Sequence, residues 1–312
     1  MSFDAVGFGA LNVDKLYRVN RIAREDEESY IKSLTESCGG SAANTIVGMS
    51  RLGLKTGFIG KVAQDREGKL LIEHFEDEGV DTGSVTLGEG RSGVVNGFVD
   101  ADGQRALYVD TGVNDLIEPE EEVHADYLNN SKVLHLASFV GKFTDNSIEA
   151  QKNLLKKISD NVCVSLDPGM LYAERGIGFL EEFLTRTNIV LINEAELKLL
   201  TGEESRGNGQ DTLKTCRDGS QALLEYGVDV VAVKCGDKGA YVTDGHQSYF
   251  KDIFPVKCVD TTGAGDAFNA GFLYGFVKGE NLEKSCLMGN FVASRCVEKP
   301  GATGGLPTDI MP

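Results

Sequence analysis

A run of small residues with an embedded carboxylate lies in the C-terminal third of the chain. Residues 260–268 read DTTGAGDAF and lead into a stretch of helical periodicity at residues 264–277. Small residues allow a backbone to approach a ligand closely, and the free N–H groups at the start of a helix, aided by the helix dipole, attract negative charge. The run therefore predicts a binding site for a phosphate group.

Asp266 stands in the first turn of this predicted helix. A carboxylate beside a bound phosphoryl group can accept the proton of an attacking hydroxyl while the N–H groups stabilise the charge that moves. The alternative is that Asp266 only complements the helix dipole and that the glycines only form a tight turn, which is the usual explanation of a lone Gly-x-Gly. The complete run favours phosphoryl-transfer chemistry.

Two further clusters combine small residues with amide or carboxylate side chains. GGSAAN occupies residues 39–44, where a helix over residues 41–52 is predicted to begin, and NEAE occupies residues 193–196. Simpler explanations exist: the glycine pair forms a turn, Asn44 lies on a solvated helix face, and Asn193 with Glu196 forms a helix-capping box. For Asn193 and Glu196, capping and function are equally well supported, and both can hold.

The order of the elements predicts an α/β protein. Apolar segments rich in β-branched residues alternate with segments of helical periodicity, which is typical of a parallel sheet covered by helices on both faces. Predicted strands cover residues 4–10, 133–137, 162–166, 189–192 and 228–233. Further predicted helices cover residues 145–158, 194–200, 211–226 and 282–297.

Short alternating stretches lie outside this rhythm, at residues 17–19, 30–32, 93–99 and 105–109. The last two are joined by the turn sequence DADG. We expect these stretches to leave the main sheet as a small β lid formed by residues of about 12–36 and 92–112. No internal repeat or flexible linker is visible, so residues 1–312 are predicted to form a single domain.

The clusters occur in the order of a known family. Together with GALNVD at residues 9–14 and KPGA at residues 299–302, they resemble the signature regions of the ribokinase family, also called the PfkB carbohydrate kinases. The resemblance covers essentially the whole chain. It implies a three-layer α/β/α fold with a β lid. It also implies an ATP-dependent kinase that transfers the γ-phosphoryl group to a primary hydroxyl of a small sugar.

The resemblance assigns roles to individual residues. It implies that Asp266 is the catalytic base. The anion hole would be formed by the amides of Gly263, Ala264 and Gly265. The positions that match the sugar-binding residues of the family are Asn12, Asp14, Gly40 and Asn44, and carboxylate and amide groups suit vicinal hydroxyls.

The resemblance also indicates nucleotide contacts. Asn193 and Glu196 match a motif that touches the phosphates of ATP, and Glu196 would position Mg²⁺ through water. Residues 233–239 match the strand and glycine loop beside the nucleotide. The matching contacts are Lys234, Gly236 and Gly239, with Lys234 standing where ribokinases usually carry threonine.

A monovalent cation site is implied by the same resemblance. Asp260 and Thr262 match positions that hold K⁺ near the anion hole in ribokinases. Gly305 stands in place of a serine that supplies one oxygen ligand in the family. At most modest activation by K⁺ is therefore expected.

The substrate is less constrained than the reaction. Ribokinases usually carry a glutamate after the strand that matches residues 133–137, and this glutamate contacts the anomeric end of the sugar. Here the sequence continues with Ser138 and Phe139 instead. An aromatic ring offers a face on which a base stacks, so a nucleoside kinase for adenosine, inosine or cytidine is the alternative, unless Phe139 belongs to the core. A non-catalytic sugar-binding sensor explains the presence of Asp266 poorly.

Composition argues against other classes of protein. A net charge of −17 without a basic cluster argues against nucleic acid, and no apolar run is long enough to span a membrane. The first residues lack the basic flank of a secretory signal, and the seven cysteines show neither zinc nor redox spacing, so we expect a cytoplasmic protein with reduced thiols. The lid strands are also expected to pair with another lid in a homodimer.

Overall fold

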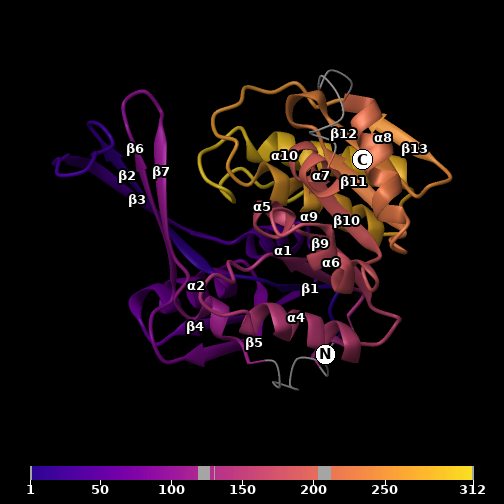
Figure 1. Ribbon diagram of the computed structural model, residues 1–312, viewed down its shortest axis with the longest axis horizontal. Coiled ribbons are helices and arrows are strands. Elements are labelled where there is room, and N and C mark those ends of the chain that lie inside the picture. The colour runs from indigo at the N-terminus through magenta and orange to yellow at the C-terminus, as the bar shows by residue number, and fades with distance from the viewer. Residues whose placement is uncertain (1, 119–126, 130, 203–211, 311–312) are drawn as a thin grey trace.

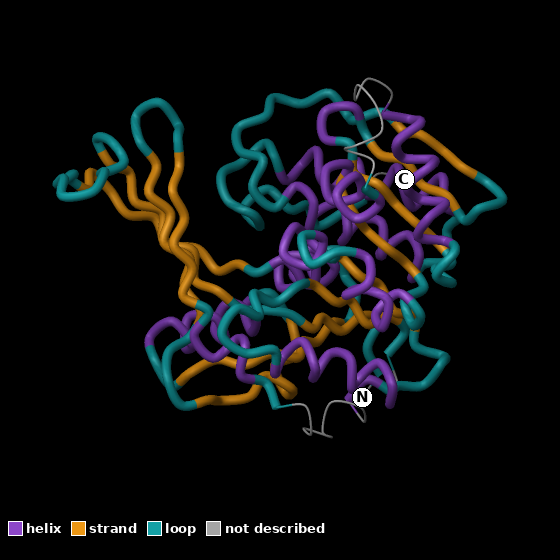
Figure 2. Tube along the Cα trace, viewed as in Figure 1, coloured by secondary structure: helices purple, strands orange, loops and turns teal. Residues whose placement is uncertain are grey.

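The computed structural model describes residues 2–118, 127–129, 131–202 and 212–310. Within them, a large sheet carries helices on both faces, and a second, smaller sheet projects from one side (Figures 1 and 2). The three-layer α/β/α fold with a small β lid is therefore confirmed. Among the described residues, no helix combines the length and the apolar character that a membrane span requires.

The large sheet has nine strands in the order β13-β12-β11-β10-β9-β8-β1-β4-β5. Their bounds are β1 (Ala5–Phe8), β4 (Thr56–Ala63), β5 (Val80–Gly88), β8 (Val133–Ala137), β9 (Cys163–Asp167), β10 (Ile189–Asn193), β11 (Val230–Lys234), β12 (Ala240–Thr243) and β13 (Ser248–Lys251). All neighbours from β5 to β11 pair in parallel, whereas β12 and β13 pair antiparallel at one edge. The predicted parallel sheet thus carries an antiparallel extension at this edge, where tight turns replace helical crossovers.

Alternate side chains of the central strands face two different cores. In β8, Leu134 and Leu136 belong to one core, whereas Val133 and Ala137 belong to the other. The first core is covered by α4 (Asn146–Lys157), α5 (Gly169–Ala173), α6 (Ile177–Leu184), α7 (Glu194–Thr201) and α8 (Thr212–Leu224). The second is covered by α1 (Ser41–Arg51), α2 (Arg66–Asp77), α9 (Ala264–Val277) and α10 (Leu282–Cys296). Burial on both faces explains why these strands are continuous apolar runs in the sequence.

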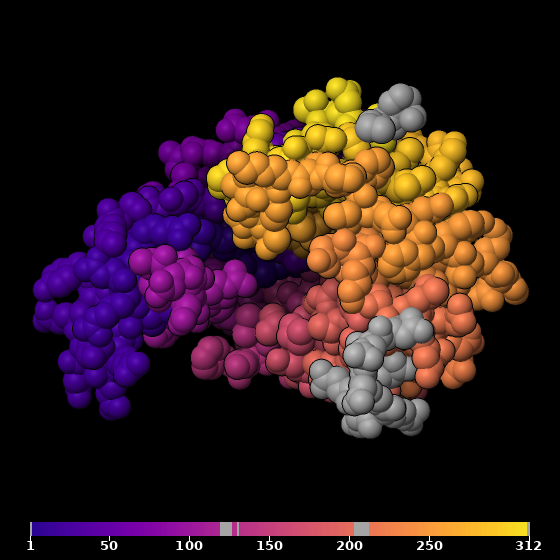
Figure 3. Space-filling view, turned by 90° about the horizontal axis from the view of Figure 1, so that it is seen from above, coloured from indigo at the N-terminus to yellow at the C-terminus, as the bar shows by residue number. Residues whose placement is uncertain are grey.

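The second sheet is the predicted lid. Its strands are β2 (Asn12–Val19), β3 (Ile31–Gly39), β6 (Gly93–Val99) and β7 (Arg105–Asp110), in the order β3-β2-β6-β7. The short helix η1 (Gly112–Leu116) follows β7. Because β2 begins shortly after β1 ends, the lid leaves the large sheet at the carboxyl end of a central strand, where ligands of open α/β sheets bind. Figure 3 shows the surface hollowed between the indigo lid and the orange and yellow C-terminal part.

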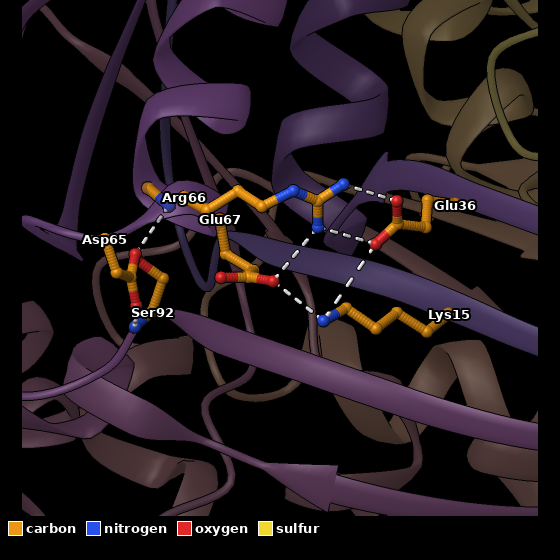
Figure 4. A network of polar contacts seen from close by, with 7 residues as sticks. Lys15, Glu36, Asp65, Arg66, Glu67 and Ser92 are labelled. Carbon is orange, nitrogen blue, oxygen red and sulfur yellow. Dashed lines mark hydrogen bonds and ion pairs between the residues drawn. The ribbon is translucent and has the colours of Figure 1, made fainter.

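Ion pairs connect the base of the lid to the start of α2 (Figure 4). Lys15 of β2 contacts Glu67 at 2.7 Å, and Arg66 contacts Glu36 of β3 at 2.6 Å. The Lys15 and Glu67 side chains are about one fifth exposed, at 19% and 17%, so solvent screens this pair less than a fully exposed one. These ion pairs help to fix the orientation of the lid strands relative to α2, a helix that covers the large sheet.

Candidate active site

The run at residues 260–268 forms a loop and the first turns of α9. Gly263 caps the helix in the left-handed conformation, with a φ of 74°. The Ala264 N–H donates to the Thr261 carbonyl at 3.2 Å, whereas the amides of Gly263 and Gly265 have no acceptor within the described part of the chain. Two of the three predicted anion-hole amides, at the N-terminus of a long helix, therefore have N–H groups without an acceptor among the described residues. The N–H of the third is used in a turn.

Two donors from α1 hold the Asp266 carboxylate. Ser41 Oγ donates to Oδ1 at 2.7 Å, and Asn44 Nδ2 donates to Oδ2 at 2.8 Å. Burial raises the pKa of Asp266 to about 7. The carboxyl group is therefore able to exchange a proton near neutral pH. Ser41 was not among the predicted site residues, and its contact with Asp266 depends on the packing of α1 against α9.

The predicted sugar-binding residues lie where the lid meets α1. Asn12 Oδ1 accepts a hydrogen bond from Asn114 Nδ2 at 2.9 Å. Asp14 packs over Gly39, its carboxylate has no hydrogen-bond or ion-pair partner among the described residues, and burial raises its pKa to about 6. Gly40, with a φ of 120°, begins α1 and so brings the donors of that helix to Asp266.

Phe139 is a core residue and not a wall of the site. Its side chain is 1% exposed, and its ring packs edge-on against Phe8 with the centroids 5.8 Å apart. No face of the ring is open to a base. The stacking argument for a nucleoside substrate is therefore wrong at this position.

A cavity of about 300 Å³ lies beside residues 260–265, which are called the anion loop below. Its lining joins the loop after β11, including Gly236 and Gly239, to Ala264 and Gly265 of α9. Apolar side chains from Ile253, Phe254, Val256, Phe268 and Val297 complete the walls. A mostly apolar cavity that ends on glycine amides suits a flat base with a phosphate tail.

Asn193 and Glu196 form the capping box of α7. The Glu196 N–H donates to Asn193 Oδ1 at 2.9 Å, and the Asn193 N–H donates to Glu196 Oε2 at 3.0 Å. The capping interpretation is thus confirmed. Glu196 is 6% exposed, and burial raises the pKa of its carboxyl group.

Asp260 and Thr262 contact each other within the anion loop. Asp260 Oδ1 accepts from the Thr262 backbone at 2.9 Å and from its hydroxyl at 2.7 Å, and Oδ2 accepts from the Gly301 N–H at 2.9 Å. Burial alone would raise the pKa of Asp260, but these hydrogen bonds outweigh it and lower the pKa. The side chains predicted to hold K⁺ already satisfy one another.

Lys234 is one of the residues that line the cavity. Its Nζ donates to Asp167 Oδ2 at 2.7 Å and to Asn269 Oδ1 at 3.2 Å. Asp167 ends β9 and Asn269 belongs to α9, so three separate elements meet at the ammonium group. Neither partner was a predicted site residue.

The chain matches the model of the pfkB family carbohydrate kinases over residues 3–309. It is 43% identical to a sugar kinase of Archaeoglobus fulgidus over 85% of this chain and 100% of that protein. It is 32% identical to an ATP-dependent ribose-1-phosphate kinase of Halopiger xanaduensis over 97% of this chain and 95% of that protein. The structure of an Arabidopsis thaliana ribokinase complexed with ribose and ATP aligns with a TM-score of 0.86 and 28% identity, over 98% of this chain and 96% of that one.

The sheet, the lid and the loop before α9, together with these similarities, define a phosphotransferase with an alcohol group as acceptor. The chain belongs to the pfkB family of carbohydrate kinases and is a sugar kinase of the ribokinase fold.

The activity is expected to rise with pH toward neutrality. Because the pKa of Asp266 is raised to about 7, the carboxyl group is protonated below that pH and cannot accept a hydroxyl proton. Below it, kcat/KM should rise about tenfold per pH unit and then level off. A pH profile of kcat/KM checks this, and a profile that stays flat between about pH 5 and 8 would show that Asp266 is not the titrating base.

The same pKa shift has the opposite sign for stability. The folded protein binds the Asp266 proton more tightly than the unfolded chain does, so this group's contribution to the free energy of unfolding falls as pH rises from its ordinary pKa of 3.8 to about 7. The Asp266→Asn variant should therefore lose less stability over this range than the wild type. Melting temperatures of both proteins across the range provide the measurement.

Proposed function

We propose that this sugar kinase transfers the γ-phosphoryl group of ATP to a primary hydroxyl of a small sugar. The observation that carries the proposal is the position of Asp266, which lies between the residues predicted to bind the sugar and the glycine amides that face the cavity. A base at this junction touches both the attacking hydroxyl and the phosphoryl group. Phosphoryl transfer requires this geometry more than it requires any covalent chemistry by the protein.

In this proposal, Asp14 and Asn12 accept hydrogen bonds from sugar hydroxyls under the lid, beside Asn44 and the Gly40 turn. The buried and unpartnered Asp14 carboxylate supports this role, because a vicinal pair of hydroxyls would supply the donors that it lacks. The attacking hydroxyl gives its proton to Asp266 as its oxygen bonds to the γ-phosphorus. ADP leaves as the bond to the bridging oxygen breaks.

The amides of Gly263 and Gly265 stabilise charge on the transferring group, with Ala264 contributing once its turn contact is released. The nucleotide lies in the cavity, against Gly236 and Gly239 of the loop after β11. Glu196 fits a role toward Mg²⁺, because its Oε1 is not used by the capping box and its buried carboxylate interacts electrostatically with Lys234, which lines the cavity. A magnesium ion held there would neutralise phosphate charge. Asn193 orients Glu196 through the capping box.

A sugar is favoured over a nucleoside as the acceptor. The loss of the Phe139 stacking surface removes the observation that pointed to a base. A nucleoside kinase stays the alternative, supported by the structure of a Methanocaldococcus jannaschii nucleoside kinase that aligns with a TM-score of 0.80 and 25% identity. A non-catalytic sensor is disfavoured by the intact base and the unengaged amides.

K⁺ has at most a modest role in this proposal. Asp260 and Thr262 satisfy each other, and Gly305 supplies no side-chain oxygen. The reduced cysteines and the acidic charge also support a cytoplasmic enzyme that acts on small molecules and not on nucleic acid.

The test of the acceptor class is ADP release measured over a panel of pentoses, hexoses, sugar acids, sugar phosphates and nucleosides at fixed ATP and Mg²⁺. The proposal predicts that kcat/KM is highest for a sugar or sugar derivative with a free primary hydroxyl, and that the matching deoxy compound without this hydroxyl is inert. Highest activity with a nucleoside would establish the alternative. ATP binding without ADP release over the whole panel would indicate a sensor.

The lid is expected to mediate a homodimer. Apolar side chains of β3 and β7 are exposed on this thin sheet, among them Ile31 at 57% and Tyr108 at 63%, and a hollow of about 500 Å³ lies beside them. A second lid would cover this apolar surface. Sedimentation at micromolar concentration should give a dimer mass for the wild type and a monomer mass for Ile31→Ser with Tyr108→Ser. A wild type that sediments as a monomer with and without substrate would contradict the lid dimer.

A further inference from the structure

Two buried polar side chains and Lys234, whose side chain is 13% exposed, form a closed cluster behind the anion loop. Asp167 Oδ2 accepts from Lys234 Nζ at 2.7 Å and from Asn269 Nδ2 at 2.6 Å, while Asn269 Oδ1 accepts from Lys234 Nζ at 3.2 Å. Asn269 is 0% exposed and Asp167 is 5% exposed. An ammonium group in such a place costs much desolvation, so a function has to be sought for it beyond stability.

Two of the three N–H groups of the Lys234 ammonium are used by this cluster. The third has no acceptor among the described residues. Gly265 lies close to Nζ, because an added Cβ there would stand 3.5 Å from the nitrogen. Lys234 and Gly265 also line the same cavity. The ammonium group, with one N–H unused, therefore lies close to the residue that precedes Asp266.

We propose that Asp167 and Asn269 hold Lys234 as a fixed cation beneath the anion hole, and that its third N–H donates to the γ-phosphoryl group during transfer. This inference rests on the proposed function, because it assumes that a nucleoside triphosphate occupies the cavity. Lys234 is then a catalytic residue, and Asp167 and Asn269 are positioning residues.

The γ-phosphoryl group is the one contacted, because Gly265 adjoins Asp266 and the transferred group must lie beside its base. As the acceptor oxygen bonds to phosphorus and the bond to the ADP oxygen breaks, charge spreads over the equatorial oxygens. A rigid donor aimed at one of these oxygens stabilises the transition state without reorganising.

The surroundings keep the ammonium charged. Burial alone would lower the pKa of Lys234, but the nearby carboxylates, Asp167 first among them, together outweigh burial and raise it. Glu196 and Asp266 act in the same direction, and His135, the other basic group nearby, stays neutral because burial lowers its pKa to about 4. The Lys234 ammonium group is thus a positive charge built into the protein, and it does not require a bound metal ion from solution.

The decisive variant removes both charges together, since Lys234→Met alone would leave Asp167 buried and unpaired. In Asp167→Asn with Lys234→Met, kcat is expected to fall about 10²-fold, the typical effect of losing one donor to the transition state. ATP affinity should fall and ADP affinity should stay unchanged, both measured by calorimetry. Lys156→Met is the matched control, because Lys156 belongs to α4, which contributes none of the described residues that line the cavity, and its side chain is 64% exposed, so kcat and both affinities should stay unchanged.

Asp167→Asn alone supplies a second readout that remains available if the double variant does not fold. It keeps the ammonium but removes the charge that holds its pKa up. A new loss of kcat at alkaline pH is therefore expected, and the wild type should lack it. If Asp167 and Lys234 had only a structural role, Asp167→Asn would lower the melting temperature without causing this loss of kcat at alkaline pH.

Wild-type kcat and an unchanged ratio of ATP to ADP affinity in the double variant would overturn the inference, and so would an Asp167→Asn profile that matches the wild type at alkaline pH. A failure of the proposed function looks different, because the wild type itself would then release no ADP with any acceptor. The ratio of ATP to ADP affinity would still decide whether Lys234 contacts the γ-phosphoryl group.

Discussion

Asp266→Asn is expected to lower kcat about 10²- to 10⁴-fold while leaving the affinities for ATP and for the acceptor nearly unchanged. The amide is almost isosteric with the carboxylate and still accepts from Ser41 or Asn44, which hold the wild-type side chain at 2.7 Å and 2.8 Å. It cannot take the hydroxyl proton. The loss should therefore appear in kcat, measured by ADP release, with both affinities measured by calorimetry.

A matched control separates catalysis from the helix dipole. Glu283 is an acidic residue in the first turn of α10, where its side chain is 42% exposed and pairs with Lys251, so Glu283→Gln removes a carboxylate charge from a helix N-terminus outside the site. Each variant should lose about 1 kcal/mol or less of stability through the dipole. Only Asp266→Asn should lose activity. A wild-type kcat in Asp266→Asn, together with a lowered melting temperature, would remove this residue from the mechanism.

Gly263→Ala is expected to lower kcat about 10²- to 10³-fold, comparable to removing an oxyanion-hole donor. Gly263 has a φ of 74°, and an added Cβ would lie 2.6 Å from the Cα of Ala302. The methyl group can be accommodated only by moving the loop that presents the anion-hole amides. The left-handed conformation alone costs a residue with a Cβ about 1–2 kcal/mol.

Gly279→Ala isolates the effect of backbone conformation. Gly279 has a φ of 78°, and a Cβ there meets no atom within 4 Å. Both variants should lose similar stability from the left-handed conformation, with a further loss for Gly263→Ala from the contact with Ala302. Activity should fall only in Gly263→Ala. Equal kcat values in the two variants would show that the position of the loop does not govern transfer.

The local pattern of apolar residues was sufficient to predict strands that are buried on both faces of the sheet. The strands at residues 133–137 and 189–192 are continuous apolar runs, and the structure confirms both as β8 and β10. We predicted no strand where β4 forms, because Gly57, Gly60 and Lys61 interrupt its apolar pattern. The antiparallel strands β12 and β13 were also missed. Residue 211, where one predicted helix begins, lies outside the described residues.

The site was predictable where its residues are adjacent in sequence. The loop at residues 260–268 and the capping box at Asn193 and Glu196 are local patterns, and the structure shows a helix N-terminus at each. The Asp167 and Lys234 pair joins residues 67 positions apart, and only the packing of β9 against its neighbours brings it together. A signal for Asp167 was present, because it follows a predicted buried strand at the carboxyl edge of a parallel sheet.

The sequence left two interpretations of Phe139 open, a stacking surface and a core residue, and the structure confirms the core residue. An aromatic residue stands where ribokinases usually carry a glutamate, and this difference suggested a stacking surface. In the structure, however, the ring points into the core and packs against Phe8. Sequence alone does not show which way a side chain points immediately after a strand ends. The direction is decided by the tertiary packing of the layer beneath.

The most direct test of the central claim identifies the product of the wild-type protein. With ATP, Mg²⁺ and the best acceptor, phosphorus NMR should show a new phosphate monoester whose signal is split by a CH₂ group. This ester should form in the same amount as ADP, and none should form when the acceptor lacks its primary hydroxyl. Release of ADP with inorganic phosphate and no ester, or binding of both ligands without any ADP, would contradict the assignment of this chain as a kinase for a primary sugar hydroxyl.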